Sequence, residues 1–445
     1  METPICDFVR DYCESRALRM HMPGHKGQSL LVMEALDLTE IDGADELYHA
    51  DGIIQQSEEN AAALFGTAKT LYSAEGSSLC IRAMLYLALL HAKAAGRRPV
   101  ICAARNAHKV FMTAAALLDL DVVWLYPKER ENVIACEINL ESLEEMLQTV
   151  CPAAVYITSP DYLGHIADIR AIADLCHAHN TLLLVDNAHG AYLRFLPASR
   201  HPMDLGADIC CDSAHKTLPV LTGGAYLHLS HRAPKTLGGW AESAMALFAS
   251  TSPSYLILQS LDAANRYLAD GYPARLSETA ERVAALKARL AAHGYALVGE
   301  ECTKLTLASK SFGYTGTALA AELQKDGIFC EFADPDFLVM MCTPETSSED
   351  FNRLERVLLK IERKAPIETR PPEPPLPERV LSAREALLSP HETLPLADCR
   401  GKVLASANVS CPPAVPITVC GERIDEAVLC SLDYYGIASC DVCIE

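Results

Sequence analysis

Residues 168–190 read DIRAIADLCHAHNTLLLVDNAHG, and this stretch decides the fold. Its first part repeats apolar residues at helical spacing, and its second part contains the continuous apolar run LLLV at 182–185. Such a run is typical of a strand in a parallel sheet, where helices cover both faces of the sheet. The stretch therefore predicts a helix followed by a buried parallel strand.

The same alternation of helix and strand patterns continues on both sides of this stretch, from about residue 61 to 230. Helices are predicted at 79–95, 107–118 and 140–150, and strands at 99–104, 121–127, 153–160, 207–215 and 225–230. Repeated βα units of this kind indicate the α/β class with a doubly wound, mainly parallel sheet.

The rest of the chain divides by composition. Long helices are predicted over 255–295, and mixed strands and helices over about 297–361. The Pro-rich stretch PIETRPPEPPLP at 366–377 predicts a stiff, extended linker. We therefore predict four segments: an N-terminal segment with the major domain (1–270), a small α/β domain (271–365), the linker (366–378) and a C-terminal unit (379–445) that packs on the main body.

Composition excludes several classes of protein. The chain has 445 residues, half of them hydrophobic, and a formal net charge of −20. The apolar content is too high for a disordered protein. The acidic excess argues against nucleic acid and anionic membrane as main partners.

The cysteines and the N-terminus favour a cytoplasmic protein. The start, METPICDFVRDYCES, has no basic and apolar signal-peptide pattern, and no run is long and apolar enough for a transmembrane span. The 18 cysteines are then interpreted as thiols in a reducing compartment. The tail motif Cys440-x-x-Cys443, after Cys399, Cys411, Cys420 and Cys430, leaves a zinc or redox site as the alternative to small buried side chains. His21 and His25 are not expected to bind a metal, because Pro23-Gly24 between them predicts a turn.

Three short segments at predicted strand ends carry candidate chemistry, which is where open α/β sheets bind ligands. Gly76-Ser77-Ser78 precedes a helix, so free N–H groups and two hydroxyls could bind phosphate, unless the serines are plain helix caps. Asp186 ends a buried strand and needs a cationic partner, a metal or a local hydrogen bond. Lys216, beside His215, could form a Schiff base or be an ordinary surface lysine. Together, in this order, these are the parts that a pyridoxal phosphate enzyme needs.

The chain resembles the Orn/Lys/Arg decarboxylase family, which are fold type I pyridoxal phosphate enzymes. The segments that carry the resemblance are MHMPGHKGQ (20–28), DELYHADGII (45–54), FGTAKTLYSAEGSS (65–78), RNAHK (105–109), TSPDYLG (158–164), DNAHGAY (186–192), DSAHKTLPVLTGGAYLH (212–228), STSPSYLILQSLD (250–262) and PPAVPITVCGERI (412–424).

The resemblance implies a site and a reaction. Lys216 would hold pyridoxal phosphate as a Schiff base, Asp186 would pair with the pyridinium nitrogen, and His215 would be a proton donor. The other implied cofactor contacts are His108 on the ring face, Gly76, Ser77, Ser78 and Ser213 at the phosphate, His189, and Thr251 and Ser252 from a neighbouring subunit. The implied activity is decarboxylation of arginine, lysine or ornithine to the amine, in polyamine biosynthesis, by a homodimer or larger homo-oligomer with shared active sites.

Four positions depart from the family pattern. Asn187 replaces an acid and Tyr192 a histidine, while Gly223 stands in place of a glutamine and Cys420 in place of a proline. These departures bear on the substrate and on decarboxylation itself. The alternatives are therefore another fold type I reaction, such as an aminotransferase or a lyase, and a non-catalytic regulatory protein that binds the cofactor.

Overall fold

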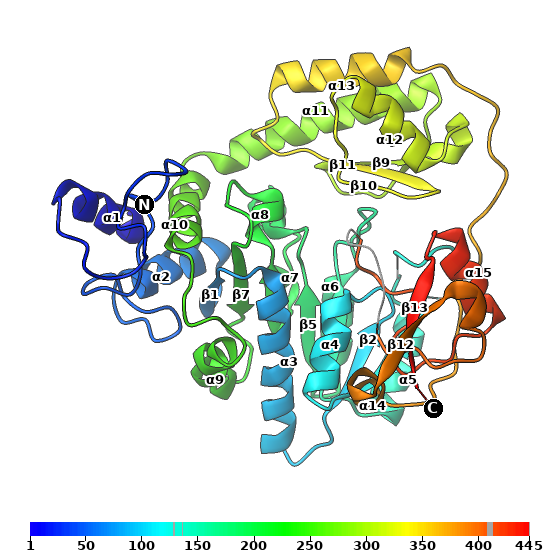
Figure 1. Cartoon of the computed structure of the whole chain (residues 1–445), viewed down its shortest axis with the longest axis horizontal. Coiled ribbons are helices and arrows are strands. Elements are labelled where there is room, and N and C mark those ends of the chain that lie inside the picture. Colours follow the sequence, from blue (N-terminus) through cyan, green and yellow to red (C-terminus); the bar gives the residue numbers. More distant parts are fainter. Residues whose placement is uncertain (128–129, 136, 407–412, 445) are drawn as a thin grey trace. The chain divides into compact units, whose positions relative to one another are not determined.

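The large sheet has the predicted class. The structure is a computed structural model that describes residues 1–127, 130–135, 137–406 and 413–444. Its largest sheet has seven strands in the order β1-β7-β6-β5-β4-β2-β3. The pairs β2–β3 and β5–β6 are parallel, whereas β7 runs antiparallel to its neighbours β1 and β6. The prediction of an α/β fold with a mainly parallel sheet is therefore confirmed (Figure 1).

Two compact units divide the chain, and each is described by itself. The first unit comprises 1–99, 147–156 and 168–274, and the second comprises 100–146, 157–167 and 275–445. The boundaries pass through helix α5 (Leu140–Thr149), strand β4 (Ala154–Thr158) and helix α11 (Tyr272–His293). The four segments predicted from composition remain a prediction.

The first unit holds strands β1 (Lys69–Ser73), β5 (Leu182–Asp186), β6 (Ile209–Asp212) and β7 (Ala225–Leu229). Its helices are α1 (Pro4–Glu14), α2 (Ile53–Phe65), α3 (Ser77–Ala94), α6 (Ile169–Ala178), α7 (Pro202–Leu205), α8 (Ala214–Thr217), α9 (Lys235–Ala246) and α10 (Tyr255–Ala269), with a 3-10 turn, η1, at Ala191–Phe195. Helix α6 begins where the sequence predicts, because the Asp168 side chain accepts a hydrogen bond from the Ala171 N–H. Every residue of β5 is buried, as its apolar run indicates.

The register in the first unit brings several strand ends to one edge of the sheet. Ser73 at the end of β1 pairs with Ala225 at the start of β7, and Asp212 at the end of β6 pairs with Tyr226. Asp186 at the end of parallel strand β5 pairs with Cys211. The loops that follow β1, β5 and β6 therefore all leave the sheet at the same edge, where α/β sheets bind ligands.

The second unit holds β2 (Val100–Ala104) and β3 (Asp121–Leu125) of the large sheet, and two smaller sheets. These are β10-β11-β9-β8 and β12-β13, formed by β8 (Leu297–Val298), β9 (Lys304–Ala308), β10 (Phe332–Ala333), β11 (Phe337–Met341), β12 (His391–Pro395) and β13 (Ser439–Cys443). Its other elements are α4 (Lys109–Leu117), η2 (Ser309–Phe312), α12 (Gly316–Lys325), α13 (Ser348–Lys360), α14 (Ala383–Leu388), η3 (Leu396–Asp398) and α15 (Glu426–Tyr434).

Within the second unit, the C-terminal residues pack on the end of β2. The Arg105 guanidinium donates to the carbonyls of Pro416 and Ile417, each at 3.0 Å, and pairs with the buried Glu422 carboxylate at 3.3 Å. A buried charge of this kind is stable only when it is paired and hydrogen-bonded. The C-terminal residues are thus held on β2 by a buried ion pair.

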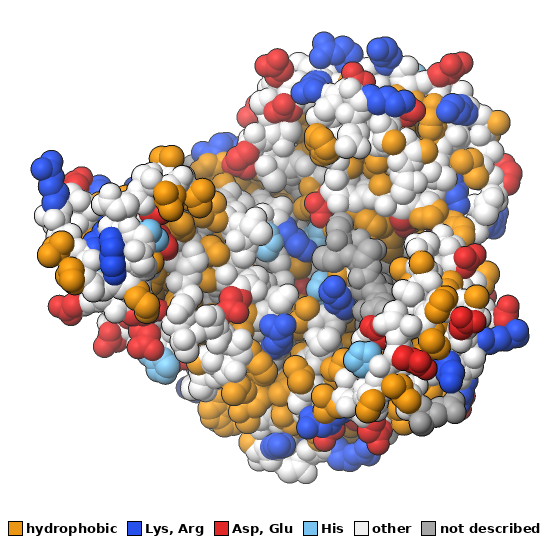
Figure 2. Space-filling model, in the orientation of Figure 1, with side chains coloured by type: hydrophobic (Ala, Val, Ile, Leu, Met, Phe, Trp, Pro, Cys, Tyr) orange, Lys and Arg blue, Asp and Glu red, His pale blue; other side chains and the backbone are white. Residues whose placement is uncertain are grey.

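The surface mixes both signs of charge, with acidic and basic side chains interspersed on the visible face (Figure 2). In the part of the chain that the structure describes, the helices are too short or too polar to cross a membrane. The predicted helices over 255–295 are present as α10 and α11, whereas α1, α2, β1 and α9 carried no prediction.

Candidate active site

Asp186 ends β5 as a buried carboxyl group, 2% exposed. Its Oδ2 accepts from the Tyr156 hydroxyl at 3.1 Å, and its Oδ1 accepts from the Ala188 N–H at 3.2 Å. Burial raises the pKa of Asp186, while the positive charge of Lys216 and the hydrogen bonds from Tyr156 and Ala188 oppose that rise. The electrostatic interaction with Lys216 supports the expectation that the buried carboxyl has a cationic partner.

Lys216 lies on the short helix α8, directly after β6. Its Nζ is 3.1 Å from Nε2 of His189, a buried histidine in the loop after β5. Neighbouring His215 has a fixed orientation, because its Nδ1–H donates to the Gly224 carbonyl at 3.0 Å. Lys216 is half-buried. Its amine lies beside His189, an imidazole that can exchange a proton with it.

The predicted phosphate residues meet at the start of α3. The Ser213 hydroxyl, which follows β6, donates to the Ser77 hydroxyl at 2.8 Å. Gly76 is the N-cap of α3 and makes no side-chain cap, so Ser77 and Ser78 occupy the first turn of the helix. The alternative that the serines are plain caps is therefore wrong. The helix begins two residues earlier than predicted and presents hydroxyl groups with its free N–H groups.

Gly223 has a structural reason to be glycine. Its φ is +101°, and a Cβ on it would lie 3.0 Å from the Ala74 carbonyl oxygen. Its own carbonyl accepts the Gly76 N–H at 2.6 Å, so the two loops pass close to each other. The glutamine of the family pattern would be strained here, because non-glycine residues disfavour this backbone region.

Thr251 and Ser252 are both exposed in a loop of the first unit. The loop is held beside α3, because the Ser250 N–H donates to the Glu75 carboxylate at 2.6 Å. His108 belongs to the second unit, where its Nδ1 caps α4 by accepting the Val110 N–H. The proposed roles of these three residues remain predictions.

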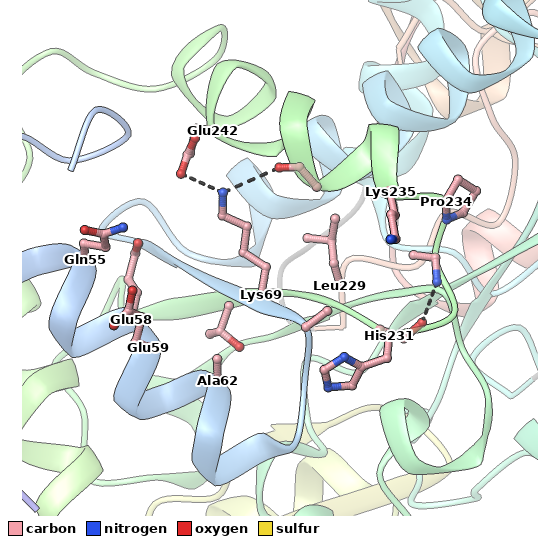
Figure 3. A pocket seen from close by; sticks show the side chains of 15 residues that line it. Gln55, Glu58, Glu59, Ala62, Lys69, Leu229, His231, Pro234, Lys235 and Glu242 are labelled. Atoms are coloured by element: carbon pink, nitrogen blue, oxygen red, sulfur yellow. Dashed lines mark hydrogen bonds and ion pairs between the residues drawn. The ribbon is translucent and has the colours of Figure 1, made fainter. Parts of the chain in front are cut away.

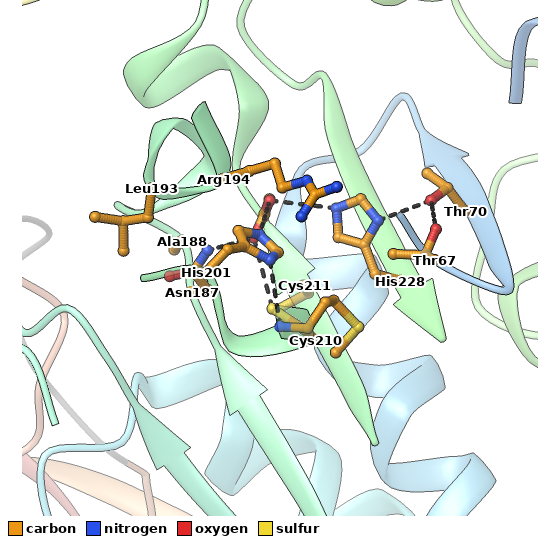
Figure 4. Close-up of polar contacts among 12 residues, drawn as sticks. Thr67, Thr70, Asn187, Ala188, Leu193, Arg194, His201, Cys210, Cys211 and His228 are labelled. Carbon is orange, nitrogen blue, oxygen red and sulfur yellow. Dashed lines mark hydrogen bonds and ion pairs between the residues drawn. The ribbon is translucent and has the colours of Figure 1, made fainter. Parts of the chain in front are cut away.

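A buried network lies behind the loops and was missed by sequence reasoning (Figure 4). Asp212, the last residue of β6, accepts from Asn187 Nδ2 at 2.7 Å, from His201 Nε2 at 2.9 Å and from His228 Nε2 at 3.2 Å. Thr70 Oγ1 lies 2.8 Å from His228 Nδ1. The two histidines lie 11 residues before and 16 residues after Asp212, so no local spacing signals the network.

Candidate metal ligands have other partners. Among the described residues, His201, Cys210 and Asp212 form a group close enough to hold an ion, but Asp212 already accepts the N–H groups of this network. His21 Nε2 lies 2.6 Å from the Tyr12 hydroxyl, and His25 Nε2 lies 3.2 Å from Asp37. In the tail, the thiol of Cys399 donates to backbone carbonyls and that of Cys443 to the Ala386 carbonyl, while Cys411 falls outside the described residues.

The first unit also has a cavity of about 510 Å³ at the other edge of the sheet (Figure 3). It opens where Lys69 at the start of β1 pairs with Leu229 at the end of β7. Lys69 spans the cavity to Glu242 at 2.7 Å, and Glu58 from α2 lines the wall. None of the predicted site residues lines this cavity, so its size does not mark it as the site of the chemistry.

Glu58 provides a test of the electrostatics of this cavity. The residue is 7% exposed, its Oε1 accepts the Tyr72 N–H at 2.8 Å, and burial raises its pKa to about 8. In the unfolded chain, Glu58 loses its proton above the ordinary glutamate pKa of about 4.3, whereas in the folded protein it keeps that proton up to about pH 8. The contribution of Glu58 to the free energy of unfolding therefore falls as the pH rises from about 4.3 to about 8. Glu58→Gln removes this dependence, since its amide oxygen still accepts the Tyr72 N–H.

We expect Glu58→Gln to increase the free energy of unfolding by more than about 1 kcal/mol at about pH 8, and to change it little at about pH 4.5. Urea denaturation of the two proteins at both pH values measures the difference. An equal difference at both pH values would contradict the raised pKa of Glu58.

Comparisons with known proteins identify the family of this chain. The sequence matches the family described as Orn/Lys/Arg decarboxylase, major domain, over residues 3–301. It is 30% identical to a protein named arginine decarboxylase from Bacillus subtilis (strain 168), over 96% of this chain and 92% of that protein. A protein of the same name from Halalkalibacterium halodurans is 29% identical over the same shares of the two chains.

Solved structures show the same fold. Lysine decarboxylase A from Pseudomonas aeruginosa superposes with a TM-score of 0.82 at 17% identity, covering 99% of this chain and 80% of that one. The lysine decarboxylase LdcF of Francisella novicida gives 0.80 at 16% identity, covering 99% and 81%. With the family match over two thirds of its length, this chain belongs to the Orn/Lys/Arg decarboxylase family.

Proposed function

We propose that this protein is a pyridoxal phosphate-dependent decarboxylase that converts a basic amino acid, namely arginine, lysine or ornithine, into the corresponding amine and CO₂. The observation that carries the proposal is that one edge of the sheet holds both a buried carboxyl, Asp186, and a lysine, Lys216, whose positive charge lowers the pKa of that carboxyl. In a chain of this family, that pair is the minimum that the cofactor requires.

The residues at this edge fit pyridoxal phosphate by their chemistry. A phosphate needs N–H and O–H donors, which the first turn of the 18-residue helix α3 supplies with Ser77 and the paired Ser213. A pyridine nitrogen needs a buried acid, and Asp186 supplies it. An aldehyde needs an amine, and Lys216 supplies it. The cofactor, when bound, supplies an electron sink for the electron pair released as the carboxylate leaves.

The protein's own residues handle charge and protons. The Asp186 carboxylate would keep the ring nitrogen protonated, because a negative charge in a buried position stabilises the positive charge of the protonated nitrogen. Lys216 Nζ would deliver the proton to Cα, and His189, 3.1 Å away, would restore it. His215 can exchange a proton only at Nε2, since its Nδ1–H is held by the Gly224 carbonyl. His215 is therefore the second candidate donor.

A product assay tests the reaction. Protein purified with pyridoxal phosphate is offered arginine, lysine and ornithine separately, and CO₂ and the amine are measured by mass spectrometry. We expect one of the three to give its amine, and the names of the similar proteins make arginine the first to test. A keto acid product would instead indicate an aminotransferase. Bound cofactor with no product from any of the three would favour another lyase substrate or a regulatory role.

We also propose that the protein works as a homodimer with shared active sites. The segment 18–36 of the first unit exposes large apolar side chains, among them Leu18 at 83%, Leu30 at 86% and Val32 at 85%. Figure 2 shows orange side chains in the region that α1 and the N-terminal segment occupy in Figure 1. Soluble monomers rarely expose such clusters, so a second copy would cover them. The exposed Thr251 and Ser252 would then reach the partner's phosphate site.

A cytoplasmic location and a part in polyamine biosynthesis complete the proposal. The 16 cysteines for which the structure gives a state are free thiols, as expected in a reducing compartment. The amine that each of the three substrates would give is a polyamine or its direct precursor.

A further inference from the structure

A buried side-chain hydrogen bond joins the two loops that would hold the cofactor. Asn187 follows Asp186, and Asp212 precedes Ser213, which leads to Lys216. Asn187 Nδ2 donates to Asp212 Oδ1 at 2.7 Å, and both side chains are completely buried. The backbone also joins the two strand ends, because the Asn187 N–H donates to the Cys211 carbonyl at 2.9 Å. The side-chain bond therefore adds a second, buried link between the end of β5 and the end of β6.

Asp212 stays an anion in this buried position. His201 Nδ1 accepts the Met203 N–H at 3.3 Å, so its proton is on Nε2 and is donated to Asp212. His228 Nε2 donates to the same oxygen, while its Nδ1 faces Thr70 Oγ1. Burial alone would raise the pKa of Asp212, but the two histidines outweigh it and hold that pKa well below its usual range.

The network crosses four neighbouring strands of the first unit. Thr70 lies on β1, His228 on β7 and Asp212 on β6, and Asn187 directly follows β5 (Figure 4). Thr67 Oγ1, 2.7 Å from Thr70 Oγ1, continues it beyond β1. A continuous buried network of this kind restricts how these strand ends can shift relative to one another.

We propose that Asn187 is a positioning residue for the cofactor: its amide, held by the Asp212 anion, sets the Asp186 carboxyl at a fixed distance from Ser213 and Lys216. The inference rests on the cofactor site of the proposed function. It concerns the distance between the two groups that would contact opposite ends of the pyridoxal ring, and it gives a role to a residue that departs from the family pattern.

The structure explains why an amide stands at this position. An acid at 187 would place a second carboxylate against Asp212 in the interior, where like charges cannot both ionise. Asparagine supplies the N–H that the anion needs. Gly190 leaves room for it, because a Cβ there would lie 2.0 Å from Asn187 Oδ1. That oxygen has no hydrogen-bond partner among the described residues, so the donation to Asp212 is the contact that orients the amide.

The first test compares two buried asparagines. Asn187→Leu removes the N–H at similar volume, and Asn265→Leu is the matched control. Asn265 is also completely buried, its Nδ2 donates to the Tyr72 hydroxyl at 2.7 Å, and its Oδ1 is likewise without a partner. Pyridoxal phosphate is titrated into cofactor-free protein by absorbance, and thermal unfolding is measured alongside.

We expect both variants to lose stability, whereas cofactor affinity falls about tenfold or more in Asn187→Leu and stays within about twofold in Asn265→Leu. Equal affinity losses in the two variants would overturn the proposal, since the effect would then be general loosening. Unchanged affinity in Asn187→Leu would overturn it as well. Failure of the unaltered protein to bind the cofactor would instead contradict the proposed function.

A second variant adds a pH signature that loss of packing would not produce. Asn187→Asp places a carboxyl against Asp212, among His201, His228, Cys210 and Tyr226. When that pair holds one proton, its O–H replaces the lost N–H, so low pH restores the bond. We expect the affinity deficit of Asn187→Asp to shrink several-fold from about pH 8 to about pH 6. A deficit independent of pH would count against the proposal.

If both Asn187 variants fail to fold, a substitution at Thr70, at the other end of the network, tests the same proposal. Thr70→Val keeps the side-chain volume and removes the hydroxyl that faces His228 Nδ1. We expect cofactor affinity to fall about threefold, although Thr70 lies three residues before the end of β1. Unchanged affinity would overturn the proposal, because the anchoring of Asp212 would then have no effect on the cofactor.

Discussion

Replacing Lys216 with alanine should abolish the visible absorbance of the lysine-bound cofactor and lower decarboxylase activity by at least about 10³-fold. Lys216 is the half-buried amine beside Asp186 and His189, so both the covalent attachment and the nearest proton donor disappear together. Absorbance spectra and amine production measure the two losses.

Lys69→Ala is the matched control for Lys216. Lys69 is also a half-buried lysine of the first unit, but it pairs with Glu242 at the opposite edge of the sheet. Its removal should leave the spectrum and the activity near those of the unaltered protein. Normal activity in Lys216→Ala would rule out the proposed role of the lysine.

Asp186→Asn should leave the cofactor bound but lower kcat by about 10²-fold or more. The amide has nearly the same shape as the carboxyl: its oxygen can still accept the Ala188 N–H, while its NH2 group can donate to the Tyr156 hydroxyl oxygen, so β5 should remain intact. What is lost is the negative charge that would keep the ring nitrogen protonated. Steady-state kinetics with the substrate found in the product assay measure the fall.

Asp208→Asn separates this effect from general destabilisation. Asp208 is a buried acid before β6 whose Oδ2 accepts the Leu183 N–H at 2.8 Å and lies 3.1 Å from His177 Nε2. Its loss should reduce thermal stability with kcat unchanged. A kcat for Asp186→Asn within about twofold of the original would contradict the role of its charge.

Much of the fold can be predicted from local patterns in the sequence. The run LLLV at 182–185 is a completely buried strand, and Asp168 caps the helix before it. These features are local, because residue periodicity and a capping side chain depend on neighbours a few positions away. Helices α1 and α2 and strand β1 were missed, since their short apolar patterns do not distinguish a helix from a strand.

The candidate site was partly predictable for a similar reason. Asp186 and Lys216 each follow a predicted strand, and Gly76 precedes a predicted helix. The rule that ligands bind at strand ends places such residues together. No sequence pattern indicates that β7 runs antiparallel to β1 and β6. Its register with these two strands nevertheless brings the loops after β1 and β6 to the same edge of the sheet.

The sequence by itself determined the α/β class, the family resemblance and the amine, acid and hydroxyl groups available for a cofactor, because these depend on residue type and local order. Only the tertiary structure decided which buried groups surround Asp212. His201 and His228 reach it from another loop and another strand. The contacts of these two histidines with Asp212 depend on strand register and on the free-energy cost of burying an unpaired charge. Neither can be predicted from the spacing of residues along the chain.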